Sequence, residues 1–213
     1  ALACRVHTAL KAEIPDLLTI IVPRHPARGP EILEICRSFG LTARRRGAAA
    51  DARKGDDRAE SGANEGTPVL PESGDGLYIA DTLGELGLFY RLAPVACIGR
   101  SFSADGGGGH NPIEAARLGC AVLHGPWVQN LENIYAEMET QGAAIRLADA
   151  EALCTTLRRL LMQGEDLCVA QEAARAFAER KAGAAEGVLT RLEPLMTRSE
   201  PPPFPRAEGC HAC

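Results

Sequence analysis

The stretch Gly106–Glu114, GGGGHNPIE, lies between two short apolar runs, Val95–Ile98 and Ala121–His124. Short apolar runs bounded by loops are typical of strands buried in a parallel sheet. Asn111 is a good helix cap and Pro112 suits the first helical position, so a helix is expected to begin here. The stretch therefore predicts a strand, a glycine loop, a helix and a second strand, which is the repeating unit of a parallel α/β fold.

Strands and helices are predicted to alternate along the rest of the chain. The expected helices cover residues 2–13, 30–39, 82–93, 112–118, 130–141, 150–163 and about 165–196, and the expected strands cover 17–22, 41–46, 77–80, 95–98, 121–124 and 143–147. The run 17–22 is continuously apolar, as expected of a strand covered on both faces, and 41–46 is expected at an edge. This alternation predicts an α/β fold with a doubly wound, mostly parallel, Rossmann-like sheet.

Two segments contain few large apolar residues. Residues 47–76 are rich in Ala, Gly, Asp, Arg and Glu and are expected to form a long mobile loop. The tail 199–213 contains a run of prolines and is expected to be disordered. The folded domain is therefore expected to cover residues 1–198.

The composition excludes several classes of protein. The chain has 46% hydrophobic but only 4% aromatic residues, so the core is expected to consist of Ala, Leu, Val and Ile. The net charge of −5 argues against sequence-independent nucleic-acid binding, which needs a basic surface. The longest apolar run, 17–22, is far below the roughly 20 residues of a membrane span. No secretory signal is recognised at the N-terminus.

The eight cysteines suggest a reducing compartment rather than a disulfide framework. Six are scattered singly through apolar patterns and are expected to be small buried hydrophobes: Cys4, Cys36, Cys97, Cys120, Cys154 and Cys168. Cys210 and Cys213 flank His211 in a C-x-x-C pattern, which is typical of a redox pair or half of a metal site. Without a second ligand pair this pattern predicts no metal site.

The glycine loop is open to two explanations. It is either a flexible loop before an ordinary helix cap, with Glu114 reaching back to a free backbone amide, or a place where a phosphate approaches the main chain closely. A dinucleotide-binding fingerprint fits poorly, because the G-x-G-x-x-G spacing ends on Asn111 or Pro112. A Walker loop also fails, since no Lys-Ser or Lys-Thr follows the glycines.

Two other segments are expected on the same sheet edge, because loops that follow parallel strands gather there. Arg24 and His25 come just after the 17–22 run, where an arginine either binds a phosphate or stays solvated. Gly84 and Gly87 lie inside the expected start of the 82–93 helix, which close packing or an approaching ligand would explain. Glu85 could cap this helix start together with Thr82.

Together the three segments resemble the C-terminal half of the Kdo (3-deoxy-D-manno-octulosonic acid) transferases, GT-B glycosyltransferases of lipopolysaccharide synthesis that use CMP-Kdo. The matching stretches are PRHPAR at 23–28, DTLGELGLFYRLAPVACIG at 81–99 and GGHNPIEAARLGCAVLHGP at 108–126. The resemblance covers roughly residues 1–195. It implies that the chain is the CMP-sugar-binding domain of a GT-B fold, without its first strand and without the N-terminal acceptor domain.

In that family the corresponding residues bind CMP. The resemblance implies CMP contacts at Pro23, Arg24, Leu83, Gly84, Glu85, Asn111, Pro112, Ile113 and Glu114, with further contacts possible at His25, Gly108, Gly109 and His110. It implies that the glycines let CMP lie over the helix start while Glu114 accepts ribose hydroxyls. It implies neither a metal nor a cofactor. No residue of this chain receives the role of catalytic base, which family members supply from the N-terminal domain.

The implied reaction of the full enzyme is the transfer of Kdo from CMP-Kdo to a lipid A precursor at the cytoplasmic face of the inner membrane. Membrane association and acceptor binding would depend on the N-terminal domain. Two alternatives stay open. One is another GT-B nucleotide-sugar enzyme, such as a UDP-sugar transferase or an epimerase, and the other is a noncatalytic domain that acts as a scaffold.

Overall fold

The computed structural model describes residues 1–48, 69–105 and 108–196. Most of the expected mobile loop at 47–76 and the whole expected disordered tail, including the Cys210 and Cys213 pair, lie outside the described residues. The chain divides into two units, 1–178 and 179–213. The first contains the sheets and the site considered below, and the second contains the C-terminal part of helix α8 (Gly164–Met196).

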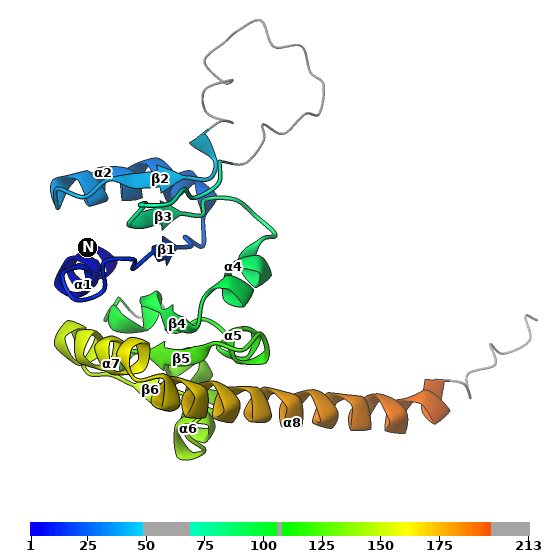
Figure 1. Cartoon of the computed structure of the whole chain (residues 1–213). Helices are drawn as coiled ribbons and strands as arrows, with labels where there is room; N and C mark the ends of the chain where they lie inside the picture. Colours follow the sequence, from blue (N-terminus) through cyan, green and yellow to red (C-terminus); the bar gives the residue numbers. More distant parts are fainter. Residues whose placement is uncertain (49–68, 106–107, 197–213) are drawn as a thin grey trace, which may run out of the picture. The chain divides into compact units, whose positions relative to one another are not determined.

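The described strands form two parallel three-stranded sheets (Figure 1). The first has the order β1-β3-β2, with β1 at Thr19–Ile21, β2 at Ala43–Arg45 and β3 at Leu77–Ile79. The second has the order β4-β5-β6, with β4 at Val95–Ile98, β5 at Ala121–His124 and β6 at Ile145–Arg146. The predicted parallel α/β class is confirmed, as is the edge position of β2, but the strands are distributed over two sheets instead of one.

Four helices connect successive strands, as parallel pairing requires: α2 (Gly29–Ser38), α4 (Leu86–Leu92), α5 (Ile113–Arg117) and α6 (Glu132–Thr140). Helix α1 (Leu2–Lys11) precedes β1, and α7 (Ala150–Met162) and α8 follow β6. All seven predicted helices are present. One correction concerns α4, which begins at Leu86 rather than Thr82, because Gly84 adopts a left-handed conformation with φ of +80°.

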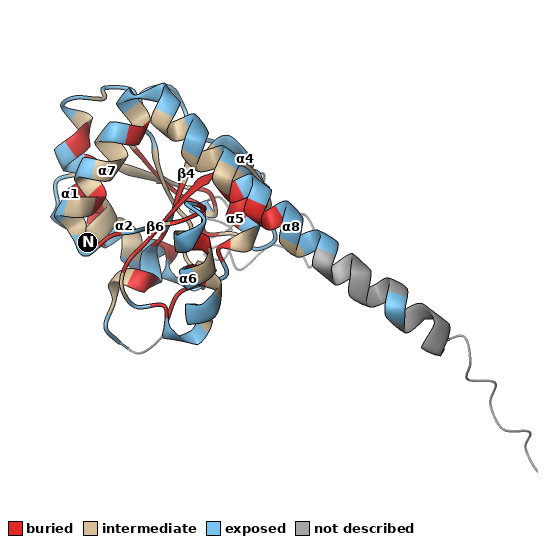
Figure 2. Cartoon of the chain, turned by 90° about the horizontal axis from the view of Figure 1, so that it is seen from below, coloured by how far each residue is buried: buried red, intermediate tan, exposed pale blue. Residues whose placement is uncertain are grey.

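The buried hydrophobic residues are mostly aliphatic, and Figure 2 shows in red where the buried residues lie. Val6 and Leu10 of α1 pack with Leu123 of β5 and Leu153 of α7, so α1 contacts the second sheet as well as the first. Leu77 and the rest of β3 are fully buried. The small residues of α5 and β5 allow Met138 and Phe177 to pack closely against them, and this cluster consists of Ala96, Ile98, Ala115, Ala116, Cys120, Val122, Met138, Ala143, Ala144, Ala174, Phe177 and Ala178.

Two predictions about burial need correction. Strand β1 is only half-buried at all three positions, although its apolar run predicted cover on both faces. This follows from its place at the end of the first sheet, where only one neighbour, β3, pairs with it among the described strands. Of the six scattered cysteines, Cys97 and Cys168 are exposed and Cys154 is half-buried, whereas the other three are buried as expected.

Among the described helices, none combines the length and the hydropathy that a transmembrane span requires.

Candidate functional site

The start of α5 is defined by Asn111. Its Oδ1 accepts a hydrogen bond from the backbone N–H of Ile113 at 3.0 Å and so satisfies the first free amide, as expected, although the N-cap position itself is occupied by Pro112. Pro112 is fully buried and lies one position before the helix, not at its first turn as predicted. As a result Glu114 is the second helical residue, exposed to solvent. The predicted reciprocal cap is not formed, because among the described residues the Glu114 carboxylate accepts no backbone hydrogen bond.

Close packing against the segment around α6 explains two of the glycines. Gly108 has φ of +63°, and a Cβ there would overlap the Asn130 side chain. A Cβ on Gly109 would lie 3.0 Å from the Tyr135 hydroxyl oxygen. Asn130 Nδ2 donates to the carbonyl of Gly109 at 2.8 Å, and the Tyr135 hydroxyl donates to the carbonyl of His110 at 2.5 Å. Asn130 and Tyr135 thus fix the backbone at Gly109 and His110 by hydrogen bonds. The sequence pattern did not indicate this role.

Arg24 brings the first predicted segment to this loop. Its Nη1 lies 3.3 Å from Nδ1 of His110. Burial, together with the positive charges of Arg24 and Arg100, lowers the pKa of His110 below its ordinary value. Pro23 is half-buried and His25 is exposed at the start of a short 3₁₀ turn, Pro26–Arg28.

The second predicted segment, which contains Leu83, Gly84 and Glu85, approaches the start of α5 at Gly87. A Cβ on Gly87, in the first turn of α4, would lie 3.8 Å from Oε1 of Glu114. Leu83, in the turn before α4, is 79% exposed. The structure therefore brings parts of all three predicted segments together around the start of α5.

Glu85 is occupied by protein partners. Its two carboxylate oxygens accept from Nε and Nη2 of Arg46, the first at 2.6 Å, and from the Thr82 hydroxyl. The Arg46 hydrogen bonds lower the pKa of Glu85 to about 2, despite partial burial, and the Thr82 hydroxyl adds to this effect. The predicted link between Glu85 and Thr82 exists, but Arg46 is the main partner.

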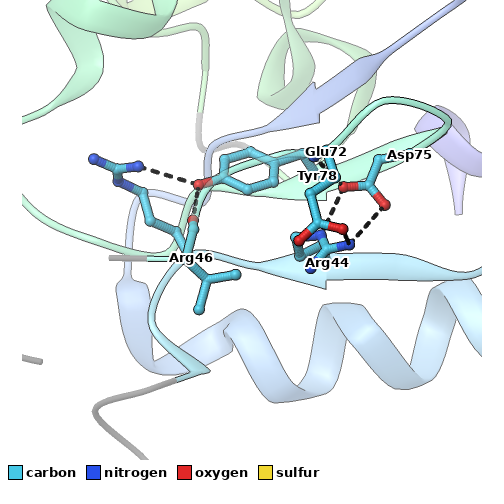
Figure 3. A network of polar contacts seen from close by, with 6 residues as sticks. Arg44, Arg46, Glu72, Asp75 and Tyr78 are labelled. Carbon is cyan, nitrogen blue, oxygen red and sulfur yellow. Dashed lines mark hydrogen bonds and ion pairs between the residues drawn. The ribbon is translucent and has the colours of Figure 1, made fainter. Parts of the chain in front are cut away.

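Arg46 belongs to a row of three arginines at the end of β2, of which Figure 3 shows Arg44 and Arg46. Arg44 donates to Asp75 at 2.6 Å and to Glu72 at 2.9 Å, before β3 begins. Arg45 donates to Asp81, just after β3, at 2.8 Å. The sequence ARRR signals such a row, but its partners were not identified from sequence, because they follow a long polar segment.

The chemistry of the site suits an anionic ligand with hydroxyl groups. Arg24 supplies an exposed guanidinium, and the exposed Glu114 carboxylate at the start of α5 can accept hydrogen bonds from hydroxyl groups. The described residues contain no group of three or more His, Cys, Asp or Glu side chains arranged to hold a metal ion.

Curated proteins similar to the chain are named 3-deoxy-D-manno-octulosonic acid transferase. The one from Rickettsia conorii (strain ATCC VR-613 / Malish 7) is 34% identical over 158 residues, which are 74% of this chain and 29% of that protein. The one from Bordetella pertussis is 32% identical over 185 residues, which are 87% of this chain and 39% of that protein. The chain thus spans well under half the length of these relatives. No protein-family model matches it.

Among solved structures, the C-terminal CMP-Kdo binding domain of WaaA from Acinetobacter baumannii is similar to the chain. The TM-score is 0.64 at 26% sequence identity, and the match covers 83% of this chain and 83% of that one. These likenesses extend over most of the chain. The chain therefore belongs to the 3-deoxy-D-manno-octulosonic acid transferase family and has the fold of the C-terminal domain of a GT-B glycosyltransferase.

Proposed function

We propose that this chain is the donor-binding domain of a glycosyltransferase that moves Kdo from CMP-Kdo to a lipid A precursor in lipopolysaccharide synthesis. The observation that carries the proposal is the meeting of three segments, joined by the Arg24 contact with His110 and by the approach of Gly87 to Glu114. CMP-Kdo is supported as the ligand because the relatives are named Kdo transferases and the similar solved structure is a CMP-Kdo binding domain.

The proposed nucleotide contacts are those that the resemblance implies, and the positions of the side chains support them. Arg24 pairs with the phosphate, since its guanidinium is exposed and fork-shaped. Glu114 accepts the ribose hydroxyls, and the turn at Leu83 and Gly84 approaches the nucleotide with its main chain. The remaining proposed contacts come from the two loops: Pro23, Asn111, Pro112 and Ile113, with His25, Gly108, Gly109 and His110 nearby. Glu85 contributes as the residue at which this turn enters α4.

In the complete enzyme, the acceptor hydroxyl oxygen forms a bond with the anomeric carbon of Kdo, with inversion. The bond between that carbon and the phosphate oxygen breaks, and its electron pair goes to the CMP phosphate. A base in the N-terminal acceptor domain takes the hydroxyl proton. Arg24 would stabilise the charge that develops on the leaving phosphate. The proposed location of this reaction is the cytoplasmic face of the inner membrane.

We further propose that residues 1–198 of this chain belong to one domain. In that domain, another parallel strand would lie between the two sheets and join them. Strands β1 and β4 support this, because each pairs along only one edge among the described strands. In the view of Figure 1 the strands follow one another in the order β2, β3, β1, β4, β5, β6, with β1 and β4 as the adjoining strands of the two sheets.

Calorimetry with CMP and UDP tests the proposal. We expect the 213-residue chain to bind CMP, weakly and in preference to UDP, and to transfer no sugar by itself. Preference for UDP would instead favour a UDP-sugar transferase or epimerase. A folded sample that binds neither nucleotide would favour a noncatalytic scaffold.

A further inference from the structure

The turn between β3 and α4 presents two proposed nucleotide contacts on a conformation that is not helical. Leu83 is largely exposed, and Gly84 has φ of +80° with no heavy atom within 4 Å of a Cβ built on it. Because Leu83 and Gly84 are both exposed, the middle of this turn takes little of its position from packing. Its position is therefore set at its two ends.

Both ends of the turn are carboxylates held by adjacent arginines of one strand end. Asp81 accepts from Nε of Arg45 and from the backbone N–H of Gly47, both at 2.8 Å. Glu85 accepts two hydrogen bonds from Arg46. Because Glu85 is also the residue before the first turn of α4, its carboxylate fixes the start of the helix and the end of the turn together.

Arg46 is itself held rigidly. Its side chain is only 7% exposed, and Nη1 lies 3.2 Å from the hydroxyl oxygen of Tyr78, to which it donates (Figure 3). The guanidinium carbon lies 5.6 Å from the centre of the Phe89 ring, and the backbone N–H of Arg46 donates to the Ile79 carbonyl at 2.9 Å. Its planar fork therefore meets the Glu85 carboxylate in a single arrangement, which a lysine could not reproduce.

We propose that Arg46 is a positioning residue of the nucleotide site, which fixes the Glu85 carboxylate and thereby the turn that presents Leu83 and Gly84 to the ligand. This inference rests on the proposed function. It assigns Glu85 to the anchoring of the turn, because both of its carboxylate oxygens already accept hydrogen bonds from Arg46 or Thr82.

The chain offers a matched control in Arg44. It lies on the same strand and also pairs with carboxylates, but Asp75 and Glu72 precede β3, whereas the proposed site lies beyond the end of that strand. Arg44→Met and Arg46→Met both remove an ion-paired guanidinium and keep an unbranched side chain. Only Arg46→Met releases the turn.

CMP affinity is measured by calorimetry on the 213-residue chain and both variants, at a temperature where circular dichroism shows each of them folded. We expect Arg46→Met to weaken CMP on the order of tenfold, as misplaced binding groups do. Arg44→Met should leave the affinity unchanged within error, even where it lowers the melting temperature. Equal losses in the two variants, or none in Arg46→Met, would overturn the positioning role.

Two further measurements keep the test decisive. In NMR spectra of the ligand-free protein, the chemical shift of the Gly84 amide should change in Arg46→Met and stay the same in Arg44→Met. An unmoved resonance overturns the inference whether or not CMP binds, whereas failure of the unsubstituted chain to bind CMP counts against the proposed function alone. Where Arg46→Met does not fold, Glu85→Gln should lower CMP affinity by itself, and unchanged affinity would overturn the inference. Where Arg46→Met and Glu85→Gln both fold, the variant that carries both substitutions should lose no more CMP affinity than either single variant. Additive losses of affinity would show that Glu85 binds CMP independently of Arg46.

Discussion

The guanidinium of Arg24 donates to Nδ1 of His110 over 3.3 Å, although 86 positions separate the two residues in the sequence. Arg24 follows β1 of the first sheet, and His110 follows β4 of the second. With Nδ1 accepting, the neutral imidazole carries its proton on Nε2. This contact links the two sheets at the carboxyl ends of β1 and β4. It leaves the neutral Nε2–H donor of His110 beside the exposed positive charge of Arg24.

Replacing Arg24 by Ala should weaken CMP and deoxy-CMP equally, because the proposed partner is the phosphate that both share. A charge-assisted hydrogen bond is worth about 1.5–3 kcal/mol, which corresponds to a loss of roughly tenfold to a hundredfold. Calorimetry measures both affinities. Arg28→Ala is the control, since Arg28 pairs with Glu31 at the start of α2, and it should leave both affinities unchanged. A selective loss of one nucleotide would contradict the phosphate assignment.

His124 makes the stability of the fold depend on pH. Its side chain is fully buried, with Nδ1 donating to the Gly125 carbonyl at 2.8 Å, and burial lowers its pKa below the ordinary value. Below about pH 6.5 the unfolded chain therefore binds a proton that the folded chain does not. The free energy of unfolding should consequently fall as the pH is lowered from 7 towards 5.

Urea denaturation of the unsubstituted chain and of His124→Asn, at several pH values, checks this expectation. The variant should be less stable at pH 7, because it leaves a cavity in the core, and its stability should depend less steeply on pH. The same slope in both proteins would show that other groups cause the pH dependence.

The secondary structure was largely predictable, because apolar runs and capping residues act locally. The helix from Glu132 to Thr140 and the cap at Asn111 are examples. The start of α4 was not, since a glycine is compatible with a helical and with a left-handed φ, and only the structure shows that Gly84 has the second, at +80°. The division into two sheets was not either, because each strand has the same apolar pattern whether one or both of its edges are paired.

Within the candidate site, the sequence identified exposed residues better than their supports. Arg24 was proposed because an arginine just after an apolar run suits a phosphate, and Glu114 was proposed from the stretch that resembles the Kdo transferases. Tyr135 appeared only as one apolar position of a helix, yet its hydroxyl holds the glycine loop through the His110 carbonyl. Such a role depends on the tertiary position of one atom, and no periodic pattern records it.

Replacing Gly108 by Ala should destabilise the protein for two separable reasons. A left-handed conformation costs a residue with a Cβ about 1–2 kcal/mol, and the new Cβ would also displace the Asn130 side chain. Gly142→Ala separates these effects, because Gly142 has a similar φ of +67° and nothing within 4 Å of a Cβ. We expect the melting temperature to fall further for Gly108→Ala. Equal decreases would mean that the contact with Asn130 contributes no stability.

Replacing Glu114 by Ala should weaken CMP more than deoxy-CMP. The carboxylate is exposed at the second position of α5, and the helix cap is supplied by Asn111, so the substitution removes a ligand contact without removing the cap. Glu114→Gln retains the length of the side chain and one acceptor oxygen, and it should lose less CMP affinity than Glu114→Ala. Calorimetry of both nucleotides against both variants separates a ribose contact from a general effect on the loop. If Glu114→Ala lowered the two affinities equally, the carboxylate would act on the loop as a whole, and its assignment to the ribose hydroxyls would have to be withdrawn.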